Sequence, residues 1–187
     1  NRAFKVLKGQ GYITEVNENI KDVDILVIAL PVTLIPEFAV NAAKYMKKGA
    51  IITDVGSTKK FITDEIEKGL SEELFFVGGH PMAGSEKNGI EALDPFLFEN
   101  AVYVITAGKK SNSYAVNKIK EMAEVLDSRV IEMDPEQHDL SVATISHLPH
   151  ILASTLVNCA GAIDKSSPNV LSLAAGGFRD TTRIASG

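Results

Sequence analysis

The chain has 187 residues, of which 45% are hydrophobic and 23% charged, a balance that supports a buried core and excludes an intrinsically disordered chain. The formal net charge of -5 gives no electrostatic basis for binding nucleic acid or an anionic membrane surface. Because Cys159 is the only cysteine, an intrachain disulfide is also excluded.

The first predicted elements are a buried strand and an amphipathic helix. Residues 24–30, DILVIAL, form a short β-branched run that ends at Pro31. The next segment places apolar residues at helical spacing: Ile35, Phe38, Ala39, Ala42, Ala43 and Met46. The unit then repeats, with a strand over 50–55, a helix that Ser57 or Thr58 can cap, and a strand over 74–79.

This alternation predicts an α/β fold with a doubly wound, Rossmann-like and mostly parallel sheet, because strands that are apolar on both faces need helices on both sides. A strand over 101–106, a helix and a last strand over 129–133 continue the pattern. Beyond this point the strand signal stops, so we expect a first domain over 1–133 and an all-helical domain over 134–187. No apolar run approaches the roughly 18 residues that span a bilayer, and we expect a cytoplasmic protein without membrane contact.

The first domain begins in mid-fold by this pattern. Residues 1–8 are typical of a helix, and GQGYIT (9–14) lacks the third glycine of a dinucleotide-binding turn and is followed by a strand signal.

Ligands of parallel sheets bind at the carboxyl ends of the strands. Four segments follow strands: LPVT (30–33), DVGSTK (54–59), GGHPMAGSE (78–86) and TAG (106–108). We expect these four segments to meet at one edge of the sheet.

His80 is the strongest catalytic candidate, since an imidazole at a strand end can accept a proton from a substrate hydroxyl near neutral pH. Gly78 and Gly79 would let the backbone approach a planar ligand. A structural histidine that bonds a turn is the alternative. Ser57 can hydrogen-bond the same substrate oxygen, or it can serve only as a helix cap.

Two further clusters lie in the predicted helical domain. His147 and His150, in SHLPH, share a helix face if the helix continues through Pro149, but no HExxH glutamate or nearby cysteine accompanies them, so we expect no metal. Arg179 and Arg183, in GGFRDTTRIA, are four apart and suit a dianionic ligand. The alternative is a surface ion pair with Asp180.

The motifs DVGSTK, GGHPMAGSE, SHLPH and GGFRDTTRIA, in this order, resemble the prephenate dehydrogenase family of tyrosine biosynthesis, including its arogenate-using relatives. The resemblance spans nearly the whole chain. It implies a nicotinamide-binding Rossmann domain, a helical domain that forms a homodimer, and NAD-dependent oxidative decarboxylation of a small-molecule substrate, prephenate, to 4-hydroxyphenylpyruvate. NADP is possible as the cofactor.

The resemblance also implies roles for single residues. His80 would be the base on the ring hydroxyl and Ser57 its hydrogen-bonding neighbour, while Arg183 would pair with a substrate carboxylate. Further residues would line the substrate pocket (Ser85, His147, His150 and Arg179) or lie near the cofactor (Leu30, Pro31, Val32, Gly56 and Ser57).

The chain departs from the family pattern at both ends. It lacks the first strand, the GxGxxG turn and the acidic residue after the second strand, and it stops before the later helices. Three alternatives therefore stay open: an arogenate dehydrogenase, a truncated non-catalytic module for dimerisation or ligand sensing, and a β-hydroxyacid dehydrogenase. The absence of any lysine from residues 134–164 speaks against the third, which needs a lysine base in its helical domain.

Overall fold

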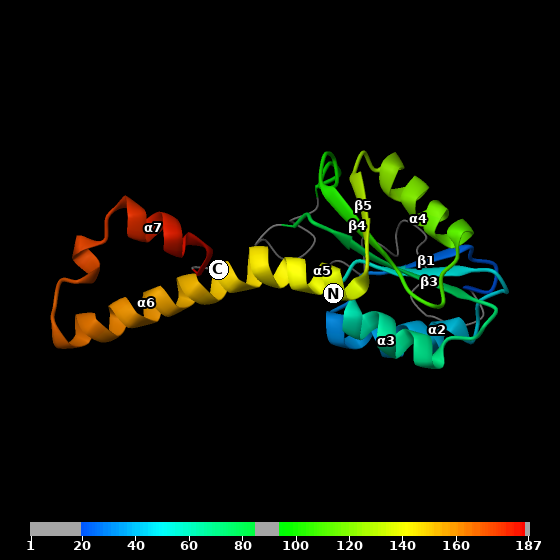
Figure 1. The fold of residues 1–187 in the computed structure, drawn as a ribbon, viewed down its shortest axis with the longest axis horizontal. Helices are drawn as coiled ribbons and strands as arrows, with labels where there is room; N and C mark the ends of the chain where they lie inside the picture. Colours follow the sequence, from blue (N-terminus) through cyan, green and yellow to red (C-terminus); the bar gives the residue numbers. More distant parts are fainter. Residues whose placement is uncertain (1–19, 85–93, 186–187) are drawn as a thin grey trace, which may run out of the picture. The chain divides into compact units, whose positions relative to one another are not determined.

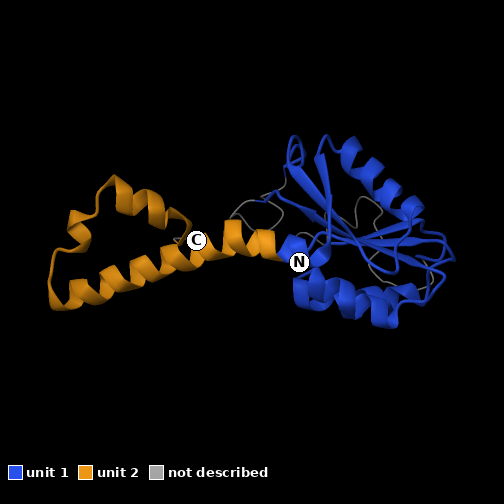
Figure 2. Ribbon diagram, in the orientation of Figure 1, with its two compact units in different colours: residues 1–139 blue, residues 140–187 orange. Residues whose placement is uncertain are grey.

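The computed structural model describes residues 20–84 and 94–185. It divides the chain into two compact units, residues 1–139 and 140–187, whose boundary falls inside helix α5 (Pro135–Val142) (Figure 2). The predicted helix over 1–8, the segment 9–14 and the candidate Ser85 lie outside the described residues.

Unit 1 contains a five-stranded sheet with the order β1-β2-β3-β4-β5. All five predicted strands are confirmed, as β1 (Ile25–Ile28), β2 (Ile51–Asp54), β3 (Phe75–Pro81), β4 (Val102–Ala107) and β5 (Arg129–Met133). The β1–β2, β2–β3 and β4–β5 pairs are parallel, which confirms a mostly parallel sheet.

The β3–β4 pair is antiparallel, and this corrects one prediction. Val77 pairs with Ala107 and Pro81 pairs with Tyr103, so β4 ends beside the start of β3. The TAG segment (106–108) therefore lies at the edge opposite to His80. A run of apolar residues predicts a strand but carries no information on its direction.

Helices cover both faces of the sheet, because each face presents apolar side chains (Figure 1). On one face α2 (Ile35–Ala43), which follows the 3-10 turn η2 (Val32–Leu34), lies beside α3 (Lys60–Gly69). These helices and strands share a core that includes Ile35, Ile52, Ile62 and Phe76. On the other face α4 (Ser113–Val125) packs on a second cluster, Ile51, Val77, Tyr103, Ile105, Ala115, Ile119 and Ala123.

Unit 2 is helical, as predicted. A π-helical segment η4 (Ala143–His147) leads into α6 (Leu148–Ser166), followed by η5 (Leu171–Leu173), α7 (Gly176–Thr182) and η6 (Arg183–Ala185). Helix α6 contacts α7 and η6. Ala153 of α6 is fully buried, but many large apolar side chains are exposed, including Leu148, Ile151, Leu152, Leu156 and Ile163.

Among the described residues, the continuous helix Pro135–Ser166 is long and apolar enough to cross a membrane, judged by length and composition alone. The expectation that no apolar run approaches this limit considered uninterrupted runs, and it therefore overlooked this helix. Scattered Ser, Thr and His residues interrupt the apolar run in the sequence without removing its average apolarity. A helix that packs in the core of a soluble assembly has the same composition.

Candidate active site

The carboxyl ends of β1, β2 and β3 lie at one edge of the sheet, because these three strands are mutually parallel. The segment Leu30–Val32 follows β1, Gly56 and Ser57 follow β2, and His80 lies near the end of β3. Leu30 is 38% exposed and Ser57 is also exposed, whereas Gly56 is buried. This edge thus offers apolar surface and a hydroxyl, which suit a planar, partly apolar cofactor ring.

A fully buried ion pair fastens β2 to β3 directly beneath this edge. Lys59 and Asp54 are 0% exposed, and the Lys59 ammonium bonds both the Asp54 carboxylate and the Gly79 carbonyl, the latter at 2.6 Å. The carboxylate also accepts hydrogen bonds from the backbone N–H of Gly56 at 2.9 Å and of Gly79 at 3.2 Å. The pair therefore holds the Gly56 loop against the residue that precedes His80.

Burial disfavours the charged form of both members of this pair. Desolvation raises the pKa of Asp54 and lowers the pKa of Lys59, against the attraction between the two charges. Each charge is stabilised in the interior only by the other and by the hydrogen bonds around it. Lys59 is consequently a structural cation, because both of its acceptors belong to the protein interior.

Gly78 and Gly79 have a role different from the predicted one. A Cβ atom at Gly79 would lie 2.6 Å from the Asp54 carbonyl oxygen and 2.9 Å from Tyr103 Oη, and one at Gly78 would collide with Thr106 Oγ1. These glycines permit close packing of β3 against its neighbours inside the protein. The expectation that they clear space for a planar ligand is therefore wrong.

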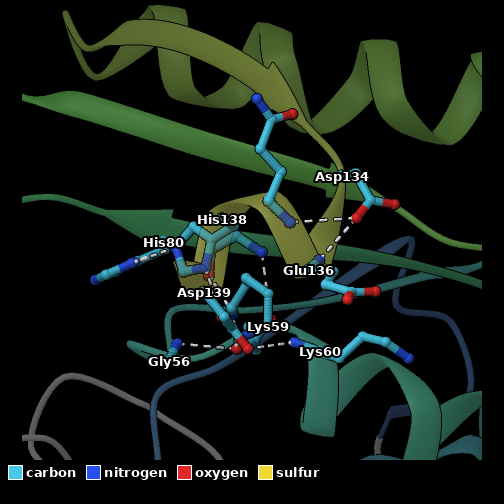
Figure 3. A network of polar contacts seen from close by, with 11 residues as sticks. Gly56, Lys59, Lys60, His80, Asp134, Glu136, His138 and Asp139 are labelled. Atoms are coloured by element: carbon cyan, nitrogen blue, oxygen red, sulfur yellow. Dashed lines mark hydrogen bonds and ion pairs between the residues drawn. The ribbon is translucent and has the colours of Figure 1, made fainter. Parts of the chain in front are cut away.

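His80 contacts a second histidine that the sequence analysis did not single out. His80 Nδ1 lies 2.8 Å from Nε2 of His138, whose ring is fully buried in the first turns of α5. The ring centroids are 5.0 Å apart with an interplanar angle of 67°, an edge-to-face arrangement. His138 lies between His80 and Asp139, and its Nδ1 is 2.7 Å from Asp139 Oδ1 (Figure 3).

Asp139 also caps helix α3. Its two carboxylate oxygens accept hydrogen bonds from the backbone N–H groups of Lys59 at 2.7 Å and Lys60 at 2.9 Å. The prediction that Ser57 or Thr58 caps this helix is wrong, because a carboxylate some 80 residues away occupies the capping position. Partial burial opposes ionisation of Asp139, but the hydrogen bonds from His138, Lys59 and Lys60 outweigh it and lower the pKa of the carboxyl group.

The remaining candidates belong to unit 2. The helix continues through Pro149, since the proline occupies the first turn of α6 directly after the π-helical segment, and both His147 and His150 are exposed. Arg179 lies in α7, whereas Arg183 begins the 3-10 turn η6, so the two arginines stand on consecutive helical segments. Both arginines are exposed.

Sequence reasoning missed four residues of this site: the buried Asp54, Lys59 and His138, and the partly buried Asp139. Asp54 and Lys59 stand inside the motif DVGSTK, where a charged residue that directly ends an apolar strand is the available signal. The His-Asp dipeptide at 138–139 follows the last strand by one helical turn. Its spacing within the chain gives no indication of its contact with His80.

Comparison with known proteins assigns both parts of the chain. The family model for the prephenate dehydrogenase nucleotide-binding domain matches residues 5–132, and that for the prephenate dehydrogenase dimerization domain matches residues 134–187. The chain is 42% identical to the prephenate dehydrogenase of Bacillus subtilis over 171 residues, which are 89% of this chain and 45% of that protein. It is 41% identical to the enzyme of Lactococcus lactis, over 91% of this chain and 47% of that protein. The chain thus spans about half the length of the curated relatives that it matches.

Solved structures of arogenate and prephenate dehydrogenases are also similar to this chain over nearly its whole length. The crystal structure of Synechocystis arogenate dehydrogenase has a TM-score of 0.83 at 30% identity, covering 99% of this chain and 67% of that chain. Prephenate dehydrogenase from Aquifex aeolicus in complex with hydroxyphenyl propionate and NAD+ has a TM-score of 0.83 at 32% identity, covering 98% and 65%.

Proposed function

The chain belongs to the prephenate dehydrogenase family, and on that premise we propose that the complete protein oxidatively decarboxylates prephenate to 4-hydroxyphenylpyruvate with NAD+. The observation that carries this proposal is the position of His80. Its ring lies at the carboxyl edge of the parallel strands, held by a second imidazole and a carboxylate. Such an arrangement suits a base that must accept a proton at neutral pH.

In the proposed reaction His80 accepts the proton of the ring hydroxyl while the C–O bond becomes a carbonyl. NAD+, when bound at this edge, would take the hydride from the same ring carbon and become NADH. The bond between the ring and its carboxylate then breaks, CO2 leaves, and the electron pair of that bond makes the ring aromatic. The former carbonyl oxygen becomes a phenolate and takes the proton back from His80, which restores the base. Ser57 would hydrogen-bond the reacting oxygen and keep it in line with His80.

The substrate has two carboxylates, and we assign their recognition to unit 2. Arg183 would pair with one carboxylate, and Arg179, His147, His150 and Ser85 are the further residues that we propose to contact the substrate. NAD+ would lie against Leu30, Pro31 and Val32 and the Gly56–Ser57 turn, which the exposed apolar surface of Leu30 supports. NADP+ is the alternative to NAD+ as cofactor, and both should be assayed.

We infer that unit 2 forms a homodimer through the exposed apolar side chains of α6. The match of residues 134–187 to a dimerization domain supports this inference. The match also favours a partner chain over lipid as the surface that buries the apolar side chains of α6. We therefore propose the expected cytoplasmic location, without membrane or nucleic-acid contact. Sedimentation of the complete protein at micromolar concentration should give a dimer, and a monomer would contradict the inference.

Arogenate is the second candidate substrate, because the arogenate dehydrogenase of Synechocystis is structurally as similar as the prephenate enzyme of Aquifex aeolicus. Assays of both substrates with both cofactors would decide between them. If the complete protein binds NAD+ but turns over neither substrate, the non-catalytic alternative is correct.

The central test is His80→Asn in the complete protein. General-base catalysis typically contributes about 10²–10⁴-fold, so kcat should fall by that factor while the dissociation constant for NAD+ stays within about twofold. Arg183→Ala should instead raise KM for prephenate far more than it weakens NAD+ binding. A His80→Asn protein with full turnover would refute the proposed function.

A further inference from the structure

We propose that His138 and Asp139 are positioning residues that fix His80 as its Nδ1–H tautomer, so that Nε2 of His80 is the proton acceptor. This inference rests on the proposed function, because it assigns a task to the residue proposed as the base. It concerns three side chains that hydrogen bonds join in series: the Asp139 carboxylate, the buried His138 imidazole and the His80 imidazole at the strand end (Figure 3). This series is called the line below.

The line of hydrogen bonds has a fixed direction at the Asp139 end. Both oxygens of Asp139 accept from backbone N–H groups, those of Lys59 and Lys60, which can only donate. An ionised carboxylate has no proton to give, and the lowered pKa of Asp139 keeps it ionised near neutral pH. The 2.7 Å contact with His138 must therefore carry the proton on His138 Nδ1.

The direction then passes through the buried ring. A neutral imidazole carries one N–H, so protonation of Nδ1 leaves Nε2 of His138 as an acceptor. That Nε2 lies 2.8 Å from His80 Nδ1, which must be the donor in this bond. The same rule applied to His80 puts its remaining lone pair on Nε2, the nitrogen that can take a substrate proton.

The line also stabilises the charge that the reaction creates. When Nε2 of His80 accepts the hydroxyl proton, its Nδ1–H still donates to His138, and the positive charge stands two hydrogen bonds from Asp139. Among the described residues, Lys59, Asp54 and Tyr103 are buried ionisable groups on this side, and Lys60, which follows Lys59, is exposed and pairs with Asp64. Lys59 and Asp54 neutralise each other, so Asp139 supplies the net negative charge.

Capping of α3 alone does not account for this arrangement. A cap needs only the Asp139 carboxylate, and Asp134 caps α5 in the same way, accepting from the backbone N–H of Glu136 at 2.8 Å. Neither cap requires a fully buried imidazole. His138 is explained by the one thing it does in addition, which is to connect Asp139 to His80.

Three variants of the complete protein test the inference. His138→Phe removes the acceptor facing His80 at similar volume, and kcat should fall about 10²-fold, with KM and the NAD+ dissociation constant within about twofold. His138→Gln keeps an acceptor and should recover at least about tenfold of that loss. Asp139→Asn keeps an acceptor oxygen but removes the charge, so the acid limb of the kcat/KM profile should move to lower pH.

The matched control is Glu136→Gln, which removes an exposed negative charge from the same helix and should leave kcat and the pH profile unchanged. Thermal melts check that each variant is folded. If a His138 variant does not fold, 15N NMR of histidine-labelled wild-type protein still decides, because it reports the tautomer of His80 directly. An Nε2–H tautomer would overturn the inference.

The outcomes also separate the inference from the proposed function. An inactive His80→Asn protein beside fully active His138→Phe and Asp139→Asn proteins, with unchanged pH profiles, overturns the positioning roles and leaves the proposed function standing. A fully active His80→Asn protein removes the proposed function itself. If His138 had only a structural role, its replacement would change neither the tautomer of His80 nor the pH profile of kcat/KM.

Discussion

Replacing Lys59 by methionine isolates the contribution of the buried ion pair. Methionine retains the length and apolar stem of lysine but removes the ammonium group, which bonds Asp54 and the Gly79 carbonyl. The Asp54 carboxylate then stays 0% exposed without its cation, supported only by the backbone N–H groups of Gly56 and Gly79. The substitution thus leaves an uncompensated charge in the interior of unit 1.

The expected loss is large. Removing one partner of a buried pair typically costs about 3–5 kcal/mol, a substantial share of the roughly 5–15 kcal/mol by which a typical domain is stable. Lys60 provides the contrast, because its pair with Asp64 is half exposed and screened by solvent, so its replacement by methionine should leave the stability nearly unchanged. Neighbouring lysines therefore differ several-fold in their effect.

Urea denaturation followed by circular dichroism measures both losses. Without its cation the Asp54 carboxyl has a folded-state pKa above its unfolded value, so the folded variant binds the extra proton and its deficit relative to wild type should shrink from about pH 7 to about pH 5. In a double-mutant cycle, Asp54→Asn should remove part of the cost of Lys59→Met. A loss below about 1 kcal/mol at neutral pH, or strictly additive losses, would refute the account of the pair.

Three further predictions concern the same unit. Gly79→Ala should destabilise it by about 1–3 kcal/mol in chemical denaturation, because the added methyl group would meet the rigid Asp54 carbonyl at 2.6 Å; an unchanged midpoint would show that the strands can separate. Burial raises the pKa of Tyr103 to about 12, so wild-type stability should fall as the pH rises above about 10, where the unfolded chain ionises first, and Tyr103→Phe should abolish that component. Asn112→Ala removes the side chain that accepts the Ala115 N–H at the start of α4, and it should lower the free energy of unfolding by about 1 kcal/mol in chemical denaturation. An effect on NAD+ binding would contradict a purely local role.

The layered fold of unit 1 could be predicted because its signals are local. The β-branched run before Pro31 and the 3.6-residue spacing of Ile35, Ala39 and Ala42 follow from how strands and helices bury side chains. The direction of β4 could not be predicted, because it depends on pairing with β3 rather than on any residue within the strand.

The same distinction between local and long-range signals applies to the candidate site. His80 was predictable from its place after an apolar run, since strand ends gather ligands. His138 and Asp139 were not, because their importance comes from contacts with residues 58 and 80 positions away in the chain. Gly78 and Gly79 were noticed for the wrong reason, as the sequence does not reveal which neighbour approaches a glycine.

Helix α5 contains the boundary between the two compact units, and its first turns hold both His138 and Asp139. Hydrogen bonds of 2.7–2.8 Å tie these two residues to the start of α3 and to the His80 ring. A substitution that loosens the first turn of α5 would therefore disturb the cap of α3 and the His80 ring together.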